Sequence, residues 1–166
     1  MANKFTEQRL IDSNKRTLIK LTGILDTEMN NVTVVDVSTL AFALNTSNQI
    51  MSSNTNPKST YDVTVKRVIG DININGLLKL QWHGASNTEM LVLGPDTYDL
   101  DLDKDGINAV ITNNETSSLG DILISTVGAT SNNSYSIILD LRKNSRDYDA
   151  GQTRDPVAFN RGAGAM

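Results

Sequence analysis

The chain has 166 residues, of which 39% are hydrophobic and 20% charged, and this composition is typical of one globular domain rather than of a disordered chain. The net charge of -4 argues against direct nucleic-acid binding, which depends on clustered Lys and Arg side chains. The lack of cysteine excludes disulfides and thiolate chemistry, and no apolar run reaches the ~20 residues that a membrane span needs.

The first segment, residues 1–15, is polar with isolated Phe5, Leu10 and Ile11, and we expect it to be an extended N-terminal arm. A period of two, which predicts β-strands, begins after it. Weaker strand patterns follow in RTLIKLT (16–22) and NVTVVDV (31–37). The next stretch, STLAFALNTSNQIM (38–51), is compatible with either a helix or a strand.

Four later segments alternate strongly between apolar and polar residues, which predicts one buried and one solvated face. YDVTVK (61–66) turns Tyr61, Val63 and Val65 to the core, and LLKLQWH (77–83) turns Leu78, Leu80 and Trp82 inward. The inward residues of TYDLDLD (97–103) and SYSIILDLR (134–142) are Tyr98, Leu100, Leu102, Tyr135, Ile137, Leu139 and Leu141. Weaker strands are predicted in EMLVL (89–93), INAVIT (107–112) and DILIST (121–126).

The segment GDINING (70–76) contains an Asn75-Gly76 pair, which favours a type I′ hairpin turn. A two-residue loop there would set Asp71 opposite Leu80 and pair a solvent-facing residue with a core residue. We therefore expect a wider loop from Gly70 to Gly76. With about nine short strands separated by turn signals, the chain predicts an all-β fold, an antiparallel two-layer sandwich or jelly roll over residues 16–143 between two arms.

One motif has the residue types of a metal site: DLDKDG (101–106) places Asp101, Asp103 and Asp105 as in the opening of a calcium-binding loop. The twelfth position holds Thr112 rather than a bidentate Glu, so the motif is no EF-hand. A calcium site of another kind and a solvated acidic strand before an Asp-Gly turn are the two remaining interpretations. No metal ligand or cofactor is assigned on this basis.

His83 is the only histidine, and the alternation places it on the outward polar face of its strand. The sequence contains no nucleophile turn of the GxSxG kind, and no carboxylate is singled out by an apolar setting. We therefore expect no catalytic residue and class the protein as a non-enzyme.

The last segment, residues 144–166, matches neither a helix nor a strand. It is dense in Arg, Tyr and Asp around a proline, a composition that is poor in a core and enriched at interfaces. We expect an extended C-terminal docking arm, with a freely solvated terminus as the alternative. The predicted partner-binding residues are Arg146, Tyr148, Arg154, Pro156 and Phe159.

Three stretches, NQIMSSNTNPKSTYDVTVKRVIG (48–70), LLKLQWHG (77–84) and DLRKNSRDYDAGQTRDPVAFN (140–160), resemble virion structural proteins of tailed bacteriophages, notably those of marine cyanobacteria. The resemblance implies a role in the phage particle and carries over no catalytic residue. The protein would be made in the host cytoplasm and end in the virion, with neither a membrane nor nucleic acid as a direct partner.

Within the virion, the expected function is that of a capsid decoration (cement) protein that binds the lattice of the major capsid protein. A homo-oligomer is expected, because several weak contacts to a repeating lattice add up through avidity. A neck or tail component of the same virion is one alternative. A carbohydrate-binding or receptor-binding sandwich is the other.

Overall fold

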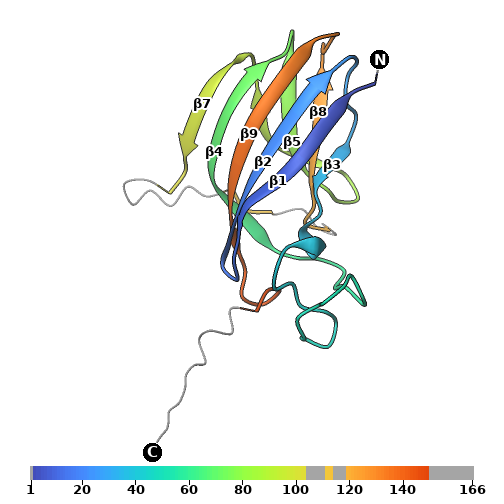
Figure 1. The fold of residues 1–166 in the computed structure, drawn as a ribbon, viewed down its shortest axis with the longest axis vertical. Coiled ribbons are helices and arrows are strands. Elements are labelled where there is room, and N and C mark those ends of the chain that lie inside the picture. Colours follow the sequence, from blue (N-terminus) through green and yellow to red (C-terminus); the bar gives the residue numbers. More distant parts are fainter. Residues whose placement is uncertain (1, 104–110, 114–118, 150–166) are drawn as a thin grey trace, which may run out of the picture.

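The protein is a sandwich of two antiparallel β-sheets in a computed structural model that describes residues 2–103, 111–113 and 119–149 (Figure 1). The elements of these residues are β1 (Lys4–Asp12), β2 (Arg16–Leu25), β3 (Val32–Val35), the 3-10 helix η1 (Val37–Thr39), β4 (Val63–Asn73), β5 (Leu77–Trp82), β6 (Thr88–Leu93), β7 (Asp96–Asp101), β8 (Ile122–Val127) and β9 (Asn133–Lys143). The predicted all-β sandwich is confirmed. No helix in this part of the chain is long and apolar enough to cross a membrane.

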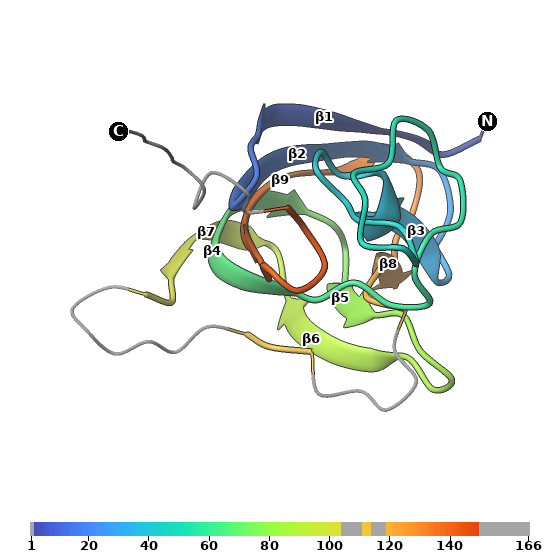
Figure 2. The same ribbon diagram turned by 90° about the horizontal axis from the view of Figure 1, so that it is seen from below.

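The first sheet has the strand order β1-β2-β9-β4-β7, and the second has the order β3-β8-β5-β6. Seen from below, the first sheet curves around the second, and β1 forms its outer edge (Figure 2). The early strand β2 pairs antiparallel with the late strand β9 over its whole length. The two halves of the sequence are therefore joined in the middle of one sheet.

The apolar ridges predicted from the alternation meet between the two sheets. The buried members of these ridges are Tyr61, Val63, Val65, Leu78, Leu80, Trp82, Tyr135, Ile137, Leu139 and Leu141. Leu78, Leu80 and Trp82 are buried, as predicted for this strand. Gln81, on the opposite face of the strand from Trp82, is also buried, and His83 is only partly exposed. Tyr98 and Leu100 are only half-buried, because β7 is an edge strand.

The connection between β4 and β5 differs from the expected wide loop. β4 continues to Asn73, and residues 74–76 alone lead to β5, which belongs to the other sheet. The predicted loop from Gly70 to Gly76 is therefore wrong. The clash of register between Asp71 and Leu80 is avoided because the two strands do not pair with each other.

The expected N-terminal arm, residues 1–15, is also wrong over most of its length. Residues 4–12 form β1, which pairs antiparallel with β2 and has a β-bulge between Arg9 and Ile11. Phe5, Leu10 and Ile11 are 44%, 44% and 42% exposed. The strand escaped prediction because it buries neither face and so has no alternation to detect.

Residues 36–62 make a long connection that closes one end of the sandwich (Figure 1). We use the name base for this connection together with residues 143–149. The connection begins at Asp36, whose Oδ1 accepts a hydrogen bond from the Ser38 N–H at 3.1 Å and caps η1. Of the stretch 38–51, residues 38 and 39 belong to η1, and residues 40–51 form only turns and isolated bridges, such as Leu44 with Ile50.

The predicted strand INAVIT (107–112) lies largely outside the described residues. Ile111 is described, and its backbone exchanges two hydrogen bonds of 3.0 Å with Val65 of β4. This isolated bridge continues the edge of the first sheet beside β4.

Candidate functional site: the base and the open edge

Tyr148, a predicted docking residue, lies in the protein's own core. Its side chain is 0% exposed, and its ring centroid lies 5.6 Å from that of Tyr61. The hydroxyl donates a hydrogen bond of 2.7 Å to the carbonyl oxygen of Val37. Burial raises the pKa of Tyr148 far above its usual range, so the hydroxyl stays protonated. The prediction that Tyr148 contacts a partner is wrong, because the residue completes the base.

Backbone hydrogen bonds hold residues 144–149 against the long connection. The Leu44 N–H donates to the Asp147 carbonyl at 2.9 Å, and the Asp149 N–H donates to the Phe42 carbonyl at 2.8 Å. The sandwich therefore extends to Asp149, and the expected boundary between residues 143 and 144 is wrong. A docking arm begins no earlier than residue 150.

Lys143 is a buried cation that joins three segments at the base. Its Nζ donates to Asp12 Oδ1 at 2.5 Å, to the Ser13 carbonyl at 2.6 Å and to the Ala41 carbonyl at 2.8 Å. Nζ also lies 5.2 Å from the centroid of the Tyr148 ring. Burial lowers the pKa of Lys143, and the Asp12 carboxylate opposes that shift. Three acceptors satisfy the three donors of the ammonium group, which makes its burial tolerable.

Asp147 is the second buried charged residue of the base. Its Oδ2 accepts a hydrogen bond of 3.0 Å from the Asp62 N–H, and its Oδ1 lies 3.5 Å from Lys58 Nζ. Lys58 Nζ also donates to the Arg146 carbonyl at 2.8 Å, while the Arg146 side chain is 71% exposed. Of the two predicted docking residues that the structure describes, Arg146 is the exposed one. Arg154, Pro156 and Phe159 lie outside the described residues.

The base brings together residues of the long connection and residues that follow β9. Lys58 and Asp147 join them by an ion pair, and Tyr61 and Tyr148 join them by ring packing.

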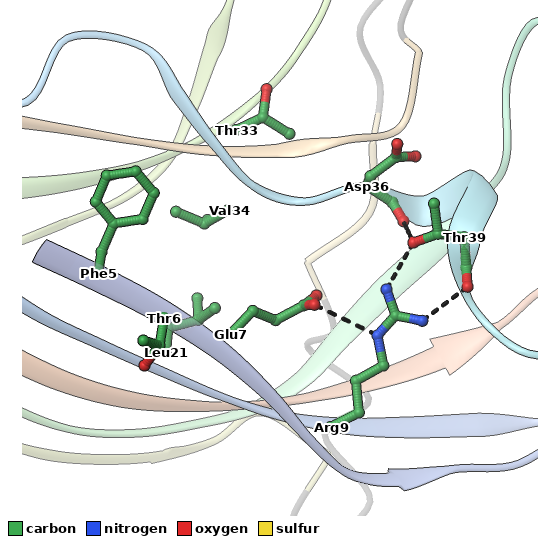
Figure 3. A pocket seen from close by; sticks show the side chains of 9 residues that line it. All are labelled: Phe5, Thr6, Glu7, Arg9, Leu21, Thr33, Val34, Asp36 and Thr39. Atoms are coloured by element: carbon green, nitrogen blue, oxygen red, sulfur yellow. Dashed lines mark hydrogen bonds and ion pairs between the residues drawn. The ribbon is translucent and has the colours of Figure 1, made fainter.

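A groove opens along the edge of the sandwich between β1 and β3 (Figure 3). Its volume is about 290 Å³, and its apolar lining comes from Phe5, Leu21 and Val34. At the other end, Arg9 Nη1 donates to the Thr39 carbonyl at 2.7 Å and Nη2 donates to Thr39 Oγ1 at 2.6 Å. Arg9 Nε lies 3.5 Å from Glu7 Oε1. Arg9 thus ties the edge strand to η1.

His83 lies beside a partly buried carboxylate. Its Nδ1 is 3.9 Å from Asp121 Oδ2, and burial raises the pKa of Asp121. Asp121 Oδ1 also accepts a hydrogen bond of 3.0 Å from the Val37 N–H, so this carboxylate has a structural role at the start of η1.

The acidic motif after β7 forms an ordinary turn where the structure describes it. Asp103 pairs with Lys66 of β4 at 2.8 Å, and its N–H donates to Asp101 Oδ1 at 3.3 Å. Asp105 lies outside the described residues. Within the described ranges, no group of three or more His, Asp or Glu side chains could hold a metal ion.

No protein-family model matches the sequence, and no curated protein or solved structure matches it.

Proposed function

We propose that the protein is a non-enzymatic structural protein of a tailed-phage virion, and that it binds the major capsid protein lattice as a decoration protein. The observation that carries the proposal is the sealed base, which fixes the chain as far as Asp149 and from which residues 150–166 continue. The resemblance of three sequence stretches to phage virion proteins supports the same class.

Residues 150–166 are the proposed contact with the capsid. They contain Arg154, Pro156 and Phe159, a cation and two apolar groups of the kinds that concentrate binding energy at interfaces. The Arg146 side chain, which is 71% exposed at the base, would add a charged contact to the proposed interface.

A carbohydrate-binding role has less support. Small-molecule and sugar sites use accessible aromatic side chains. Four aromatic residues of the described chain are instead buried in the core, namely Tyr61, Trp82, Tyr135 and Tyr148.

Co-sedimentation with capsids that lack the protein tests the proposal. The chain truncated after Asp149 keeps the hydrogen bonds and ring contacts of the base described above, so it should fold and lose capsid binding. Phe159→Ala and Arg154→Ala should each weaken binding, whereas Thr153→Ala in the same segment serves as the matched control. Undiminished occupancy of the truncated chain would exclude the arm as the contact.

The number of copies per virion separates the decoration role from the neck or tail role. A copy number near that of the capsid subunit supports decoration, and a few copies support the neck or tail. Absence of the protein from purified particles would contradict both.

A further inference from the structure

The sandwich has four edge strands, and β1 is the longest of them. β1 has 9 residues, β6 and β7 have 6 each, and β3 has 4. On its outer side β1 pairs with no strand of the described chain (Figure 2). Such an edge presents unpaired N–H and C=O groups that can accept another strand.

The side chains of β1 also leave apolar surface in solvent. Phe5 is exposed near the start of β1, and Leu10 and Ile11 are exposed near its end.

The sequence of β1, KFTEQRLID, is complementary to itself in charge. When two copies are set antiparallel around Gln8, Glu7 of each copy lies opposite Arg9 of the other. Residues opposite each other in an antiparallel pair share a face of the sheet. Glu7 and Arg9 point toward the same side of β1 (Figure 3). The β-bulge follows Arg9, so it leaves the central triplet of residues 7–9 intact.

The other edges lack this property. In an antiparallel pair of β7 strands, Asp96 would oppose Asp101, and like charges directly opposite each other are destabilising. β3 is too short for an extended pairing. On β6, Glu89 is the only charged residue, so two antiparallel β6 strands would form no pair of opposite charges.

We propose that two copies of the chain associate through β1, antiparallel about a two-fold axis at Gln8, so that their first sheets become one continuous sheet. The dimer covers the exposed apolar residues of β1 and forms two symmetric Glu7–Arg9 pairs. Two-fold pairing of one patch with itself is the commonest form of soluble oligomer. The proposal stands without the virion role, since it depends only on β1.

Charge reversal at the centre of β1 tests the pairing. Glu7→Arg places an arginine opposite Arg9 of the second copy and should raise the dimer dissociation constant about tenfold or more in sedimentation equilibrium. Asp71→Arg makes the same change of charge at an exposed position on β4, away from the edge, and should leave the dimer unchanged.

Mixing two variants gives the decisive result. Glu7→Arg and Arg9→Glu chains should each be monomeric, and their mixture should form a heterodimer in native mass spectrometry, because both cross-strand pairs become attractive again. Arg9→Glu removes the hydrogen bonds to Thr39, so thermal unfolding is used to check that this variant folds. If Arg9→Glu does not fold, the effect of Glu7→Arg on the dimer dissociation constant tests the proposal by itself.

Three results would overturn the proposal. They are a monomeric wild-type chain at high concentration, a dimer that Glu7→Arg does not weaken, and a mixture of two folded variants without heterodimers.

Discussion

The base and the β1 edge both contain many charged residues, but some of these residues are buried at the base, whereas those at the edge stay partly exposed. Both segments are rich in charge, yet Lys143 and Asp147 are buried at the base while Glu7 and Arg9 remain partly exposed at the edge. At the base, carbonyl groups and opposite charges close around each buried charged atom. The density of charge along a sequence therefore does not decide exposure, which depends on whether hydrogen-bonding partners from distant segments converge.

The largest effect is expected from two truncations of the C-terminal segment. Ending the chain after Asn144 removes Tyr148, and loss of a buried aromatic side chain costs about 3–5 kcal/mol of the free energy of unfolding. Ending it after Asp149 should change that free energy by less than about 0.5 kcal/mol. Urea denaturation of the two chains measures the difference. Equal stability would show that the base does not contribute to the fold.

The second effect concerns the buried cation. Lys143→Ala leaves the Asp12 carboxylate and two carbonyl groups without their donor, and breaking such a buried pair costs about 3–5 kcal/mol. Lys15→Ala removes an exposed lysine nearby and should cost less than about 0.5 kcal/mol. If denaturant titration gives the two variants the same free energy of unfolding, Lys143 is not a structural centre.

A smaller effect on the free energy of unfolding should distinguish the hydroxyl groups of two buried tyrosines, Tyr148 and Tyr135. Tyr148→Phe loses the hydrogen bond to Val37 and should cost about 1 kcal/mol. The Tyr135 hydroxyl has no hydrogen-bond partner in the described structure, so Tyr135→Phe should be neutral or stabilising. Chemical denaturation at neutral pH compares the two variants, and an equal loss in both would contradict the hydrogen-bond assignment.

The pH dependence of stability sharpens this difference. Burial raises the pKa of Tyr135 from 10.0 to about 12 in the folded protein. Between these values the unfolded chain has lost a proton that the folded protein retains, so the free energy of unfolding falls as pH rises through this window. Tyr135→Phe should fall less steeply than the wild type between pH 10 and about pH 12. Parallel curves in this range would contradict the burial of the hydroxyl.

A small effect on stability is expected at the edge. Phe5 is 44% exposed, so only part of its surface is buried, and Phe5→Ser should change the free energy of unfolding of the monomer by about 1 kcal/mol. The same substitution should weaken the dimer, because it removes apolar surface that the second copy covers. Unfolding at low protein concentration and sedimentation at high concentration separate the two quantities.

Sequence alternation predicted the strands that bury one face, including the ridge from Tyr135 to Leu141. Lys143 is the next inward position of the same strand after Leu141, so the alternation itself predicts that it is buried. A lysine is not expected in a core, and its burial was therefore not predicted. The strand β1 gave no signal, because it lies at an edge and buries neither face. The turn signal of Asn75-Gly76 was misleading because the chain changes sheets there, and sheet membership is set by distant pairing.

The position of Tyr148 could not be predicted from its neighbours in the sequence. It depends on contacts with Val37 and Tyr61 in a connection about a hundred residues earlier, and local composition does not encode such contacts. Arg154, Pro156 and Phe159 stay predicted partner residues.

Hydrogen exchange of the backbone at two protein concentrations tests the contrast between base and edge most directly. The amides of residues 144 and 147–149 should be protected at both concentrations, because their hydrogen bonds are internal. The amides of β1 that face away from β2 should exchange quickly in dilute protein and become protected in concentrated protein, when a second copy pairs with them. Fast exchange at the base, or exchange of β1 that does not depend on concentration, would contradict the account.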